Sequence, residues 1–344
     1  MPRMLAAVLA AVFAAACAPG LQRAAPAPAD TSAPAPLLWR VERDGVRSYL
    51  FGTMHVGLTM AEGLTPVGLA RLDEARRVVV ELDLAEPEAI AQATRELAAS
   101  GMLPAGESLR SMLPAAHWTT LVGLHHDVVP AAALDRLQPW FAALSAVGRL
   151  ELRRAAADAA DAPPPLVPMD VAIARRAKAA GVPVVGLERT ADQVRTFAGL
   201  NRAQSLALLG EILADVDSVT TQLRELQSAY AGGDNAAALG AYVRQMARDT
   251  PELTELLLFR RNRRWIPRLQ YLLPAGDVFV AVGAAHLFGE QGLIALLRAR
   301  GWTVTRERGD AAPARRSQEP RQERRNGDER EQRRDDHQPG HVLG

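Results

Sequence analysis

Short apolar runs separated by amphipathic stretches make up the middle of the chain. Six runs have the composition of strands: Leu37–Glu42, Arg47–His55, Arg77–Asp83, Val182–Glu188, Asp277–His286 and Trp302–Arg306. The first two are separated by the glycine-containing turn Arg43-Asp44-Gly45-Val46, so they predict a β-hairpin. The later runs are almost continuously apolar, which is typical of parallel strands covered on both faces.

Patterns with helical period fill the spaces between these runs. Ala61–Arg76 joins the second run to the third, and Gly289–Arg300 joins the last two. Two longer insertions, 87–160 and 201–273, are divided by proline and glycine into short helices, about three of them in the second insertion. We therefore expect an α/β fold: a small mixed sheet with an N-terminal β-hairpin, flanking helices, and a helical cap formed by the two insertions over the strand ends.

Both ends of the chain differ in composition from this middle part. Residues 1–17 carry a positive charge, an apolar stretch and small residues before Cys17, which is the pattern of a lipoprotein-type signal peptide. Residues 18–36 form a Pro/Ala-rich linker. Residues 309–344 form a charged tail, with eight arginines and eight acidic residues, that has too little apolar surface to fold. The sequence thus predicts one folded domain over residues 37–308.

The N-terminal pattern predicts export. Ala14 stands where a lipidation motif usually has leucine, so ordinary signal cleavage is an alternative to lipidation of Cys17. Ala18 follows Cys17 in place of the aspartate associated with retention in the inner membrane. We therefore expect the protein in the cell envelope, at the periplasmic face of the outer membrane, held by a lipidated Cys17.

Composition excludes several classes of function. The net charge of +1 gives no global field that would favour nucleic acid, so no nucleic-acid partner is expected. Lys178 is the only lysine and lies in a helical pattern, so neither a Walker A loop nor a Schiff-base lysine is expected. With a single cysteine, the chain forms no internal disulfide and no cysteine cluster for a metal. A metal site would have to use His, Asp and Glu.

Two strand-like runs end in the same pattern, Gly-x-x-His, at His55 and at His286. Ligands of α/β sheets bind beyond the carboxyl ends of the strands, where these two histidines can converge. Glu81 lies inside a third apolar run, where an ionised carboxylate is costly unless it is paired or bound to a metal. His55, Glu81 and His286 therefore form a candidate site. The alternative is that the strand-end histidines are hydrogen-bonded structural residues.

Three other residues are candidates for the same site. Glu188, at the end of the fourth run, either faces the site or caps the helix that follows. Asp170 stands just before a helical pattern, where an N-cap role is the simpler interpretation. Arg261, in a cluster of arginines, either belongs to a solvated helix face or reaches the site to hold a carboxylate or an oxyanion. The remaining histidines of the middle part are interpreted as structural or exposed: His117, His125 and His126.

These motifs, taken in order, resemble the TraB/GumN family, which includes the Tiki proteases. The resemblance covers about Leu37 to Val304 and rests on the two Gly-x-x-His motifs, Glu81, Asp170, Glu188 with Gln193, Arg261-Asn262 and the segment Gly283–Leu293. It implies an erythromycin-esterase-like α/β fold. By analogy with Tiki, it also implies a metal-dependent peptidase in which the two histidines and the strand glutamate form the site.

Two neutral imidazoles and a carboxylate suit a divalent metal such as Mn, Co, Zn or Fe. A bound metal lowers the pKa of a water and polarises a carbonyl, while Glu188 or another carboxylate takes the proton. We therefore expect a lipid-anchored, metal-dependent hydrolase acting on a peptide or an exported polypeptide. Two alternatives stay open: a non-catalytic protein that binds or sequesters a peptide or small signal, and a metal-free esterase-like hydrolase.

Lipidation of Cys17 can be tested by detergent phase partitioning. The native protein should enter the detergent phase because an acyl chain adds apolar surface. Cys17→Ser should move the protein to the aqueous phase or leave its precursor uncleaved. Equal partitioning of the two proteins would contradict lipidation.

Overall fold

A computed structural model describes residues 35–54, 58–158 and 167–307 of the 344-residue chain. Six strands in these ranges form one sheet with the order β4-β3-β5-β2-β1-β6. Their bounds are β1 Leu38–Arg43, β2 Val46–Thr53, β3 Arg77–Val80, β4 Val184–Gly186, β5 Val278–Gly283 and β6 Thr303–Arg306. The predicted signal peptide with Cys17, nearly all of the linker, His55 and the charged tail lie outside the described residues.

Five of the six described strands run in one direction, and β1 alone runs opposite to them. β1 and β2 form the predicted hairpin, with Leu38 opposite Phe51, and β6 pairs with the other edge of β1. β2, β5, β3 and β4 pair in parallel, in that order. The predicted α/β fold with a mixed sheet and an N-terminal hairpin is therefore confirmed.

The strands of the parallel part end earlier than the sequence predicted. Glu81, Glu188 and His286 therefore follow β3, β4 and β5 instead of lying within them. Next to β5 the Glu81 side chain continues the hydrogen bonding, because its Oε1 accepts the backbone N–H of Gly283 at 2.7 Å. Next to β4 a backbone bond persists, from Glu188 N–H to the carbonyl oxygen of Glu81 at 3.0 Å. The apolar runs continue past that point, so periodicity did not reveal where the ladder stops.

Helices fill the connections. Their bounds are α2 Met60–Asp73, α3 Pro87–Ser100, α4 Leu109–Met112, α5 Ala115–His125, α6 Ala131–Leu134, α7 Pro139–Asp158, α8 Met169–Ala179, α9 Thr190–Ala198, α10 Arg202–Ala214, α11 Val216–Ala231, α12 Asn235–Asp249, α13 Pro251–Thr254, α14 Arg260–Leu272 and α15 Leu293–Arg298, with the π-helix η2 Glu255–Phe259 and the 3₁₀ helices η3 Leu273–Ala275 and η4 Ala284–Leu287. Within the part of the chain that the structure describes, no helix is long and apolar enough to cross a membrane.

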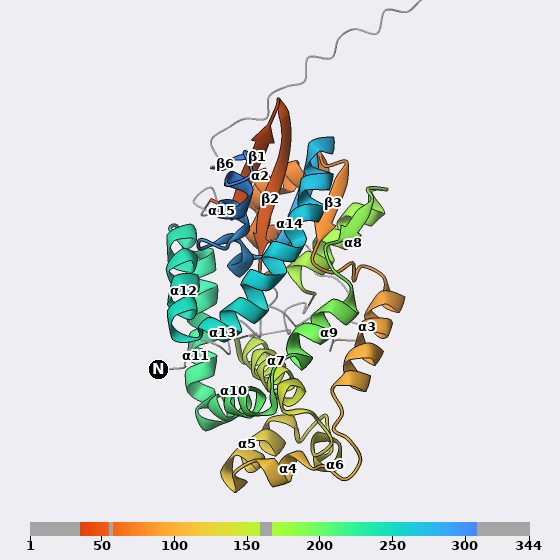
Figure 1. The fold of residues 1–344 in the computed structure, drawn as a ribbon, viewed down its shortest axis with the longest axis vertical. Coiled ribbons are helices and arrows are strands. Elements are labelled where there is room, and N and C mark those ends of the chain that lie inside the picture. The colour runs from red at the N-terminus through yellow and green to blue at the C-terminus, as the bar shows by residue number, and fades with distance from the viewer. Residues whose placement is uncertain (1–34, 55–57, 159–166, 308–344) are drawn as a thin grey trace, which may run out of the picture. The chain divides into compact units, whose positions relative to one another are not determined.

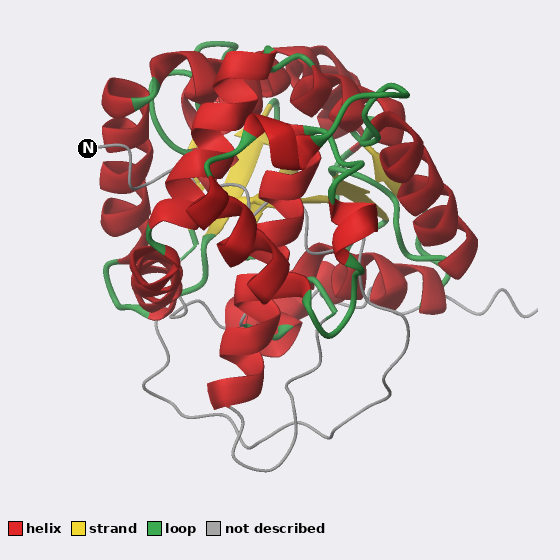
Figure 2. Cartoon of the chain, turned by 90° about the horizontal axis from the view of Figure 1, so that it is seen from below, coloured by secondary structure: helices red, strands yellow, loops and turns green. Residues whose placement is uncertain are grey.

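Helices of both insertions gather beyond the carboxyl end of β2 (Figure 1). α7 of the first insertion packs against α10 and α11 of the second. Tyr230 of α11 donates its hydroxyl hydrogen to the carbonyl oxygen of Gly52 near the end of β2, at 2.6 Å. Seen from the side of these helices, the strands lie behind them (Figure 2). The two insertions therefore form a cap over one end of the sheet.

The second insertion holds more helix than the three predicted, and its last helix leaves the cap. After α12 the chain continues through α13 and η2 into α14, which runs across the sheet in Figure 1. The side chains of Trp265, Ile266 and Leu269 on α14 are buried in the core. Ser48 of β2 donates to the carbonyl oxygen of Leu273 just beyond α14, at 3.4 Å. An amphipathic pattern alone does not distinguish packing on a sheet from packing in a cap.

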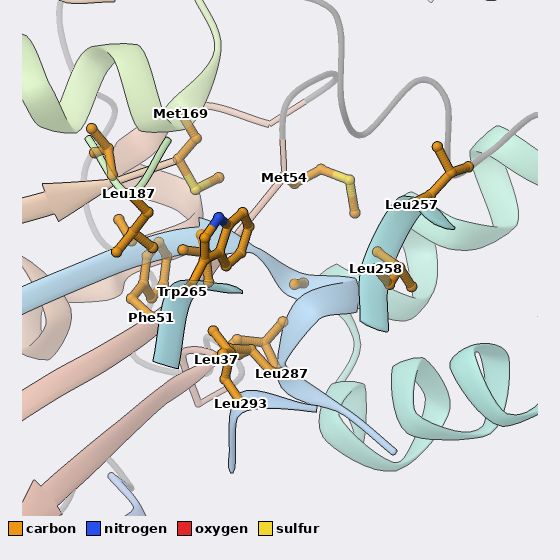
Figure 3. Close-up of a cluster of buried hydrophobic side chains, with 14 of the residues drawn as sticks. Leu37, Phe51, Met54, Met169, Leu187, Leu257, Leu258, Trp265, Leu287 and Leu293 are labelled. Carbon is orange, nitrogen blue, oxygen red and sulfur yellow. The ribbon is translucent and has the colours of Figure 1, made fainter. Parts of the chain in front are cut away.

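Sheet and helices share one large hydrophobic core. Figure 3 shows the part of it where Trp265 of α14 lies near Phe51 of β2 and Leu187. Met169 of α8 and Leu287 of η4 belong to the same cluster. The polar residues that follow β3, β4 and β5 therefore lie beside a dry interior.

His125 of α5 offers a test of cap packing. Its ring is fully buried, with Nδ1 at 2.9 Å from the carbonyl oxygen of Leu121 and Nε2 at 2.7 Å from Ser145 Oγ. A carbonyl oxygen only accepts, so Nδ1 carries the proton and Ser145 donates to Nε2. Burial lowers the pKa of His125 below its ordinary value. Between the ordinary and the lowered pKa, the unfolded chain binds a proton that the native protein does not.

The free energy of unfolding should therefore fall as the pH drops below about 6.5, the ordinary histidine pKa. His125→Gln should be less stable than the parent at pH 8 but should lose less stability between pH 8 and pH 5. His126→Gln serves as the control, because His126 is exposed on the same stretch of chain. Urea unfolding at several pH values measures both effects. An unchanged pH dependence in His125→Gln would contradict this account.

Candidate active site

An arginine brings together three residues that follow different strands. Arg261 Nη2 lies 2.5 Å from Glu81 Oε2 and 2.5 Å from Glu188 Oε1. Arg261 Nη1 lies 3.1 Å from His286 Nε2. Glu81 Oε1 is 3.7 Å from the same nitrogen. We call Glu81, Glu188, Arg261 and His286 the polar cluster.

The polar cluster is shielded from solvent. Arg261, Glu81 and His286 are only 1%, 3% and 2% exposed. The side chain of Glu188 is 4% exposed. Burial opposes the charge of Arg261, but the two carboxylates outweigh it and raise the pKa of the guanidinium above its ordinary value. Arg261 is therefore a permanent cation between two carboxylates, and none of the three charges is left without a counter-charge.

Glu188 is held by two residues of α14. Its Oε2 accepts from Arg261 Nε at 3.3 Å and from Trp265 Nε1 at 3.2 Å. Arg261 and Trp265 are four residues apart and so share one face of the helix. The N-cap residue of α9 is Arg189, so the interpretation of Glu188 as a helix cap is wrong. The strong ion pair with Arg261 is what turns the Glu188 side chain away from the helix that follows.

Asn262 fixes the orientation of His286. Asn262 Oδ1 lies 2.7 Å from His286 Nδ1, and Asn262 Nδ2 donates to the carbonyl oxygens of His286 and Gln291 at 3.1 and 2.8 Å. Because the amide oxygen only accepts, Nδ1 carries the proton, and the lone pair of Nε2 accepts from Arg261. The ring of Trp265 packs on the imidazole with centroids 4.5 Å apart. His286 therefore points an unprotonated Nε2 at Glu81.

A π-helical turn precedes this part of α14. η2 ends at Phe259, and its residue Leu257 accepts a hydrogen bond from Arg261 Nη1 at 3.4 Å. π-Helical turns occur frequently at functional sites because they change which side chains share a helix face. The turn supports the conformation of the Arg261 side chain inside the polar cluster.

The two Gly-x-x-His segments lie against each other. A Cβ atom at position 52 would come within 2.9 Å of Leu287 Cδ1 and 3.1 Å of Ala284 Cα, so this close approach requires glycine. The next residue, Thr53, pairs with Gly283 in the parallel register of β2 and β5. The described part of the first motif is therefore in direct contact with the second.

The other predicted residues have different outcomes. His55 lies outside the described residues. Asp170 is buried in the first turn of α8, but the N-cap residue is Pro168, so the N-cap interpretation is wrong. The helix starts at Met169, one residue before Asp170, directly after Pro168, whose ψ of 143° is not helical. His125 is buried and hydrogen-bonded in the cap and His126 is exposed, in line with structural or exposed roles.

Trp265 was missed by sequence reasoning, and Asn262 appeared only within the family motif. The signal for Trp265 was its spacing of four residues from Arg261, which places both on one helix face. The role of Asn262 depends on how η4 folds against α14, which no local pattern reveals.

Across the three described ranges, no group of three or more His, Cys, Asp or Glu side chains could hold a metal ion. Glu81 and His286 nevertheless have the donor chemistry of a metal site. The Nδ1 of His286 is held by an outer partner, as is usual for metal-binding histidines. The 3.7 Å between Glu81 Oε1 and His286 Nε2 suits two ligands that are each about 2 Å from one ion. The third predicted ligand is His55, so the complete metal site stays a prediction.

With this fold and these motifs, the chain belongs to the TraB/PrgY/gumN family, whose model matches residues 37–306. It is 26% identical over 321 residues to Metalloprotease TIKI2 of Danio rerio, covering 78% of this chain and 60% of that protein. It is 25% identical over 319 residues to Metalloprotease TIKI1 of Homo sapiens, covering 78% and 61%. The uncharacterized protein YbaP of Escherichia coli is 24% identical over 250 residues, covering 73% of this chain and 87% of YbaP.

The matched region spans about three fifths of the length of these TIKI relatives. No solved structure matches the chain. The resemblance seen in the sequence motifs is confirmed at the level of the family.

Asn262→Leu tests the support of His286. The variant leaves the Nδ1–H of the imidazole without its partner and two carbonyl oxygens without a donor, so the free energy of unfolding should fall by about 1–3 kcal/mol. Arg268→Leu, on the exposed side of the same helix, should change it by less than about 0.5 kcal/mol. Urea unfolding compares the two. Similar stabilities would show that Asn262 does not hold the site together.

Proposed function

We propose that this protein is a metal-dependent, peptidase-like hydrolase whose metal ligands are His55, Glu81 and His286. The approach of Glu81 to the unprotonated Nε2 of His286, at 3.7 Å, is the observation that carries the proposal. Membership of a family in which the TIKI relatives are named metalloproteases supports it.

Strand register supports His55 as the third ligand. His55 follows Thr53 by two residues, and Thr53 pairs with Gly283, which precedes His286 by three. Gly52 is in close contact with the second motif as well. Two motifs of the same Gly-x-x-His pattern therefore follow the carboxyl ends of adjacent parallel strands.

A divalent ion held there would lower the pKa of a water and polarise a substrate carbonyl. Around it, Asn262 keeps the proton of His286 on Nδ1, so that Nε2 has a lone pair, and Glu188 is a further carboxylate of the polar cluster that could take a proton. Arg261, paired with Glu188 beside the ion, could stabilise a developing oxyanion. Asp170 is assigned to the site on the family resemblance alone.

We further propose that the enzyme is exported and held at the periplasmic face of the outer membrane by a lipidated Cys17, where it acts on a peptide or an exported polypeptide. The N-terminal sequence pattern supports this. The carbonyl oxygen of Ala35 accepts from Asn235 Nδ2 and Arg306 Nη2, both at 3.1 Å. Ala35, the first described residue, is thus bonded to the domain, and 17 residues of sequence, 18–34, lie between it and Cys17.

One observation favours a second candidate, a metal-free esterase-like hydrolase. His286 Nε2 already accepts from Arg261 and lies near Glu81, so a histidine–carboxylate pair oriented by an arginine is in place without any ion. In that case His286 and Glu81 would move the proton themselves. The two candidates differ in their sensitivity to chelators.

Metal analysis of the purified protein, combined with turnover of a peptide library with and without chelator, tests the proposal. Bound metal and loss of turnover in chelator, restored by adding metal, are expected. Glu81→Ala and His286→Ala should each lower turnover by roughly 100-fold or more, because each removes a ligand. His126→Ala, at an exposed histidine, is the matched control and should keep full activity.

Full activity in chelator would replace the proposal with the metal-free hydrolase. Stoichiometric peptide binding without turnover would contradict both hydrolases and identify a binding protein.

A further inference from the structure

Arg261 contacts the same groups that the proposed function assigns to a metal. Its Nη2 lies 2.5 Å from Glu81 Oε2, and its Nη1 donates to His286 Nε2 at 3.1 Å. An ion bound through Glu81 and His286 needs the lone pair of that nitrogen. The Nε2 lone pair of His286 cannot accept a hydrogen bond from Arg261 and bind a metal ion at the same time.

Charge leads to the same conflict. The polar cluster contains two carboxylates and one guanidinium, so its net charge is −1 when His286 is neutral. A divalent ion added with Arg261 in place would lie beside a fixed positive charge inside a buried site. Like charges at such short range repel strongly where water is excluded. Binding of the ion therefore requires the guanidinium to move away from Glu81 and His286.

Glu188 can keep Arg261 ion-paired after its contacts with Glu81 and His286 are broken. The Nε and Nη2 atoms of Arg261 both contact the carboxylate of Glu188, at 3.3 and 2.5 Å, which is a two-point pair. Trp265 Nε1 also donates to Oε2 of Glu188, at 3.2 Å, and its ring packs under the guanidinium, with 4.8 Å between Arg261 Cζ and the ring centroid. Arg261 can thus release Glu81 and His286 and still keep a complete ion pair.

We propose that Arg261 is a built-in competitor of the metal: it occupies Glu81 and His286 in the metal-free protein and withdraws onto Glu188 when an ion binds. This inference rests on the proposed metal-dependent function. Without metal, Arg261 then compensates the charge of Glu81 and hydrogen-bonds His286. The metal affinity depends on the competition between Arg261 and the ion for these two side chains.

The test measures metal binding by the full chain, with Mn²⁺, Co²⁺ and Zn²⁺ each titrated calorimetrically. Arg261→Gln removes the competing charge, so it should bind the preferred ion at least tenfold more tightly than the parent. Its melting temperature should be lower than that of the parent in chelator, because two buried carboxylates lose their counter-charge, and should rise more on adding metal. Arg263→Gln, at an exposed arginine two residues away that pairs with Glu255, is the control and should match the parent.

Glu188→Gln separates withdrawal from direct ligation. Without the two-point pair, Arg261 should hold Glu81 more firmly, and metal affinity should fall about tenfold. In the double variant Arg261→Gln/Glu188→Gln this loss should disappear, because there is no arginine left to withdraw. If Glu188 were itself a metal ligand, its substitution would weaken binding equally in both backgrounds, and the competition would be refuted.

If Arg261→Gln does not fold, Arg261→Lys replaces it. A lysine ammonium is a point charge without the planar fork, so it does not span both carboxylates and His286. Its metal affinity should lie above that of the parent. Equal or weaker binding by the Arg261 variants, with a parent that binds metal, would overturn the competition and leave the proposed function intact. A parent and variants that all fail to bind Mn²⁺, Co²⁺, Zn²⁺ and, titrated without oxygen, Fe²⁺ would overturn both.

Discussion

A guanidinium buried between two carboxylates connects parts of this protein that lie far apart in the sequence. Arg261 comes from the start of α14, Glu81 from the end of β3, and Glu188 from the end of β4. Breaking a buried ion pair of this kind typically costs about 3–5 kcal/mol, because the remaining charge stays in the interior. The cluster adds a polar attachment to the apolar contacts of Trp265, Ile266 and Leu269, which bury α14 against the sheet. The next residue of α14, Asn262, orients His286.

The atoms that stabilise this part of the fold are also those that the proposed function uses. Glu81 closes the edge of β5 through Gly283, pairs with Arg261 and faces His286. A substitution at Glu81 removes all three roles at once, so loss of activity alone would not identify a catalytic part. Functional sites commonly contain buried polar groups that a purely structural core would avoid. Conservative substitutions of residues that contact the polar cluster distinguish structural from catalytic roles better than replacement of the cluster residues themselves.

Sequence reasoning identified the sheet, the hairpin and all four members of the polar cluster as candidates, and the motifs identified the family. A buried carboxylate in an apolar run requires a counter-charge, and Arg261 supplies it for Glu81. The pattern did not show where the strands stop, because the apolar runs continue beyond the hydrogen-bonded ladder. It also did not show that α14 leaves the cap for the sheet, or that Trp265 and Asn262 hold Glu188 and His286. Those contacts depend on tertiary packing between distant segments.

The close approach at Gly52 has a consequence for how this chain can vary. With no room for a Cβ between Gly52 and Ala284, added volume on one motif is transmitted directly to the other. The hydroxyl of Tyr230 on the carbonyl oxygen of Gly52 limits movement on the cap side as well. Gly52 and the segment Ala284–Leu287 are therefore constrained to vary together, and a larger residue at position 52 would require a matching loss of volume in that distant segment.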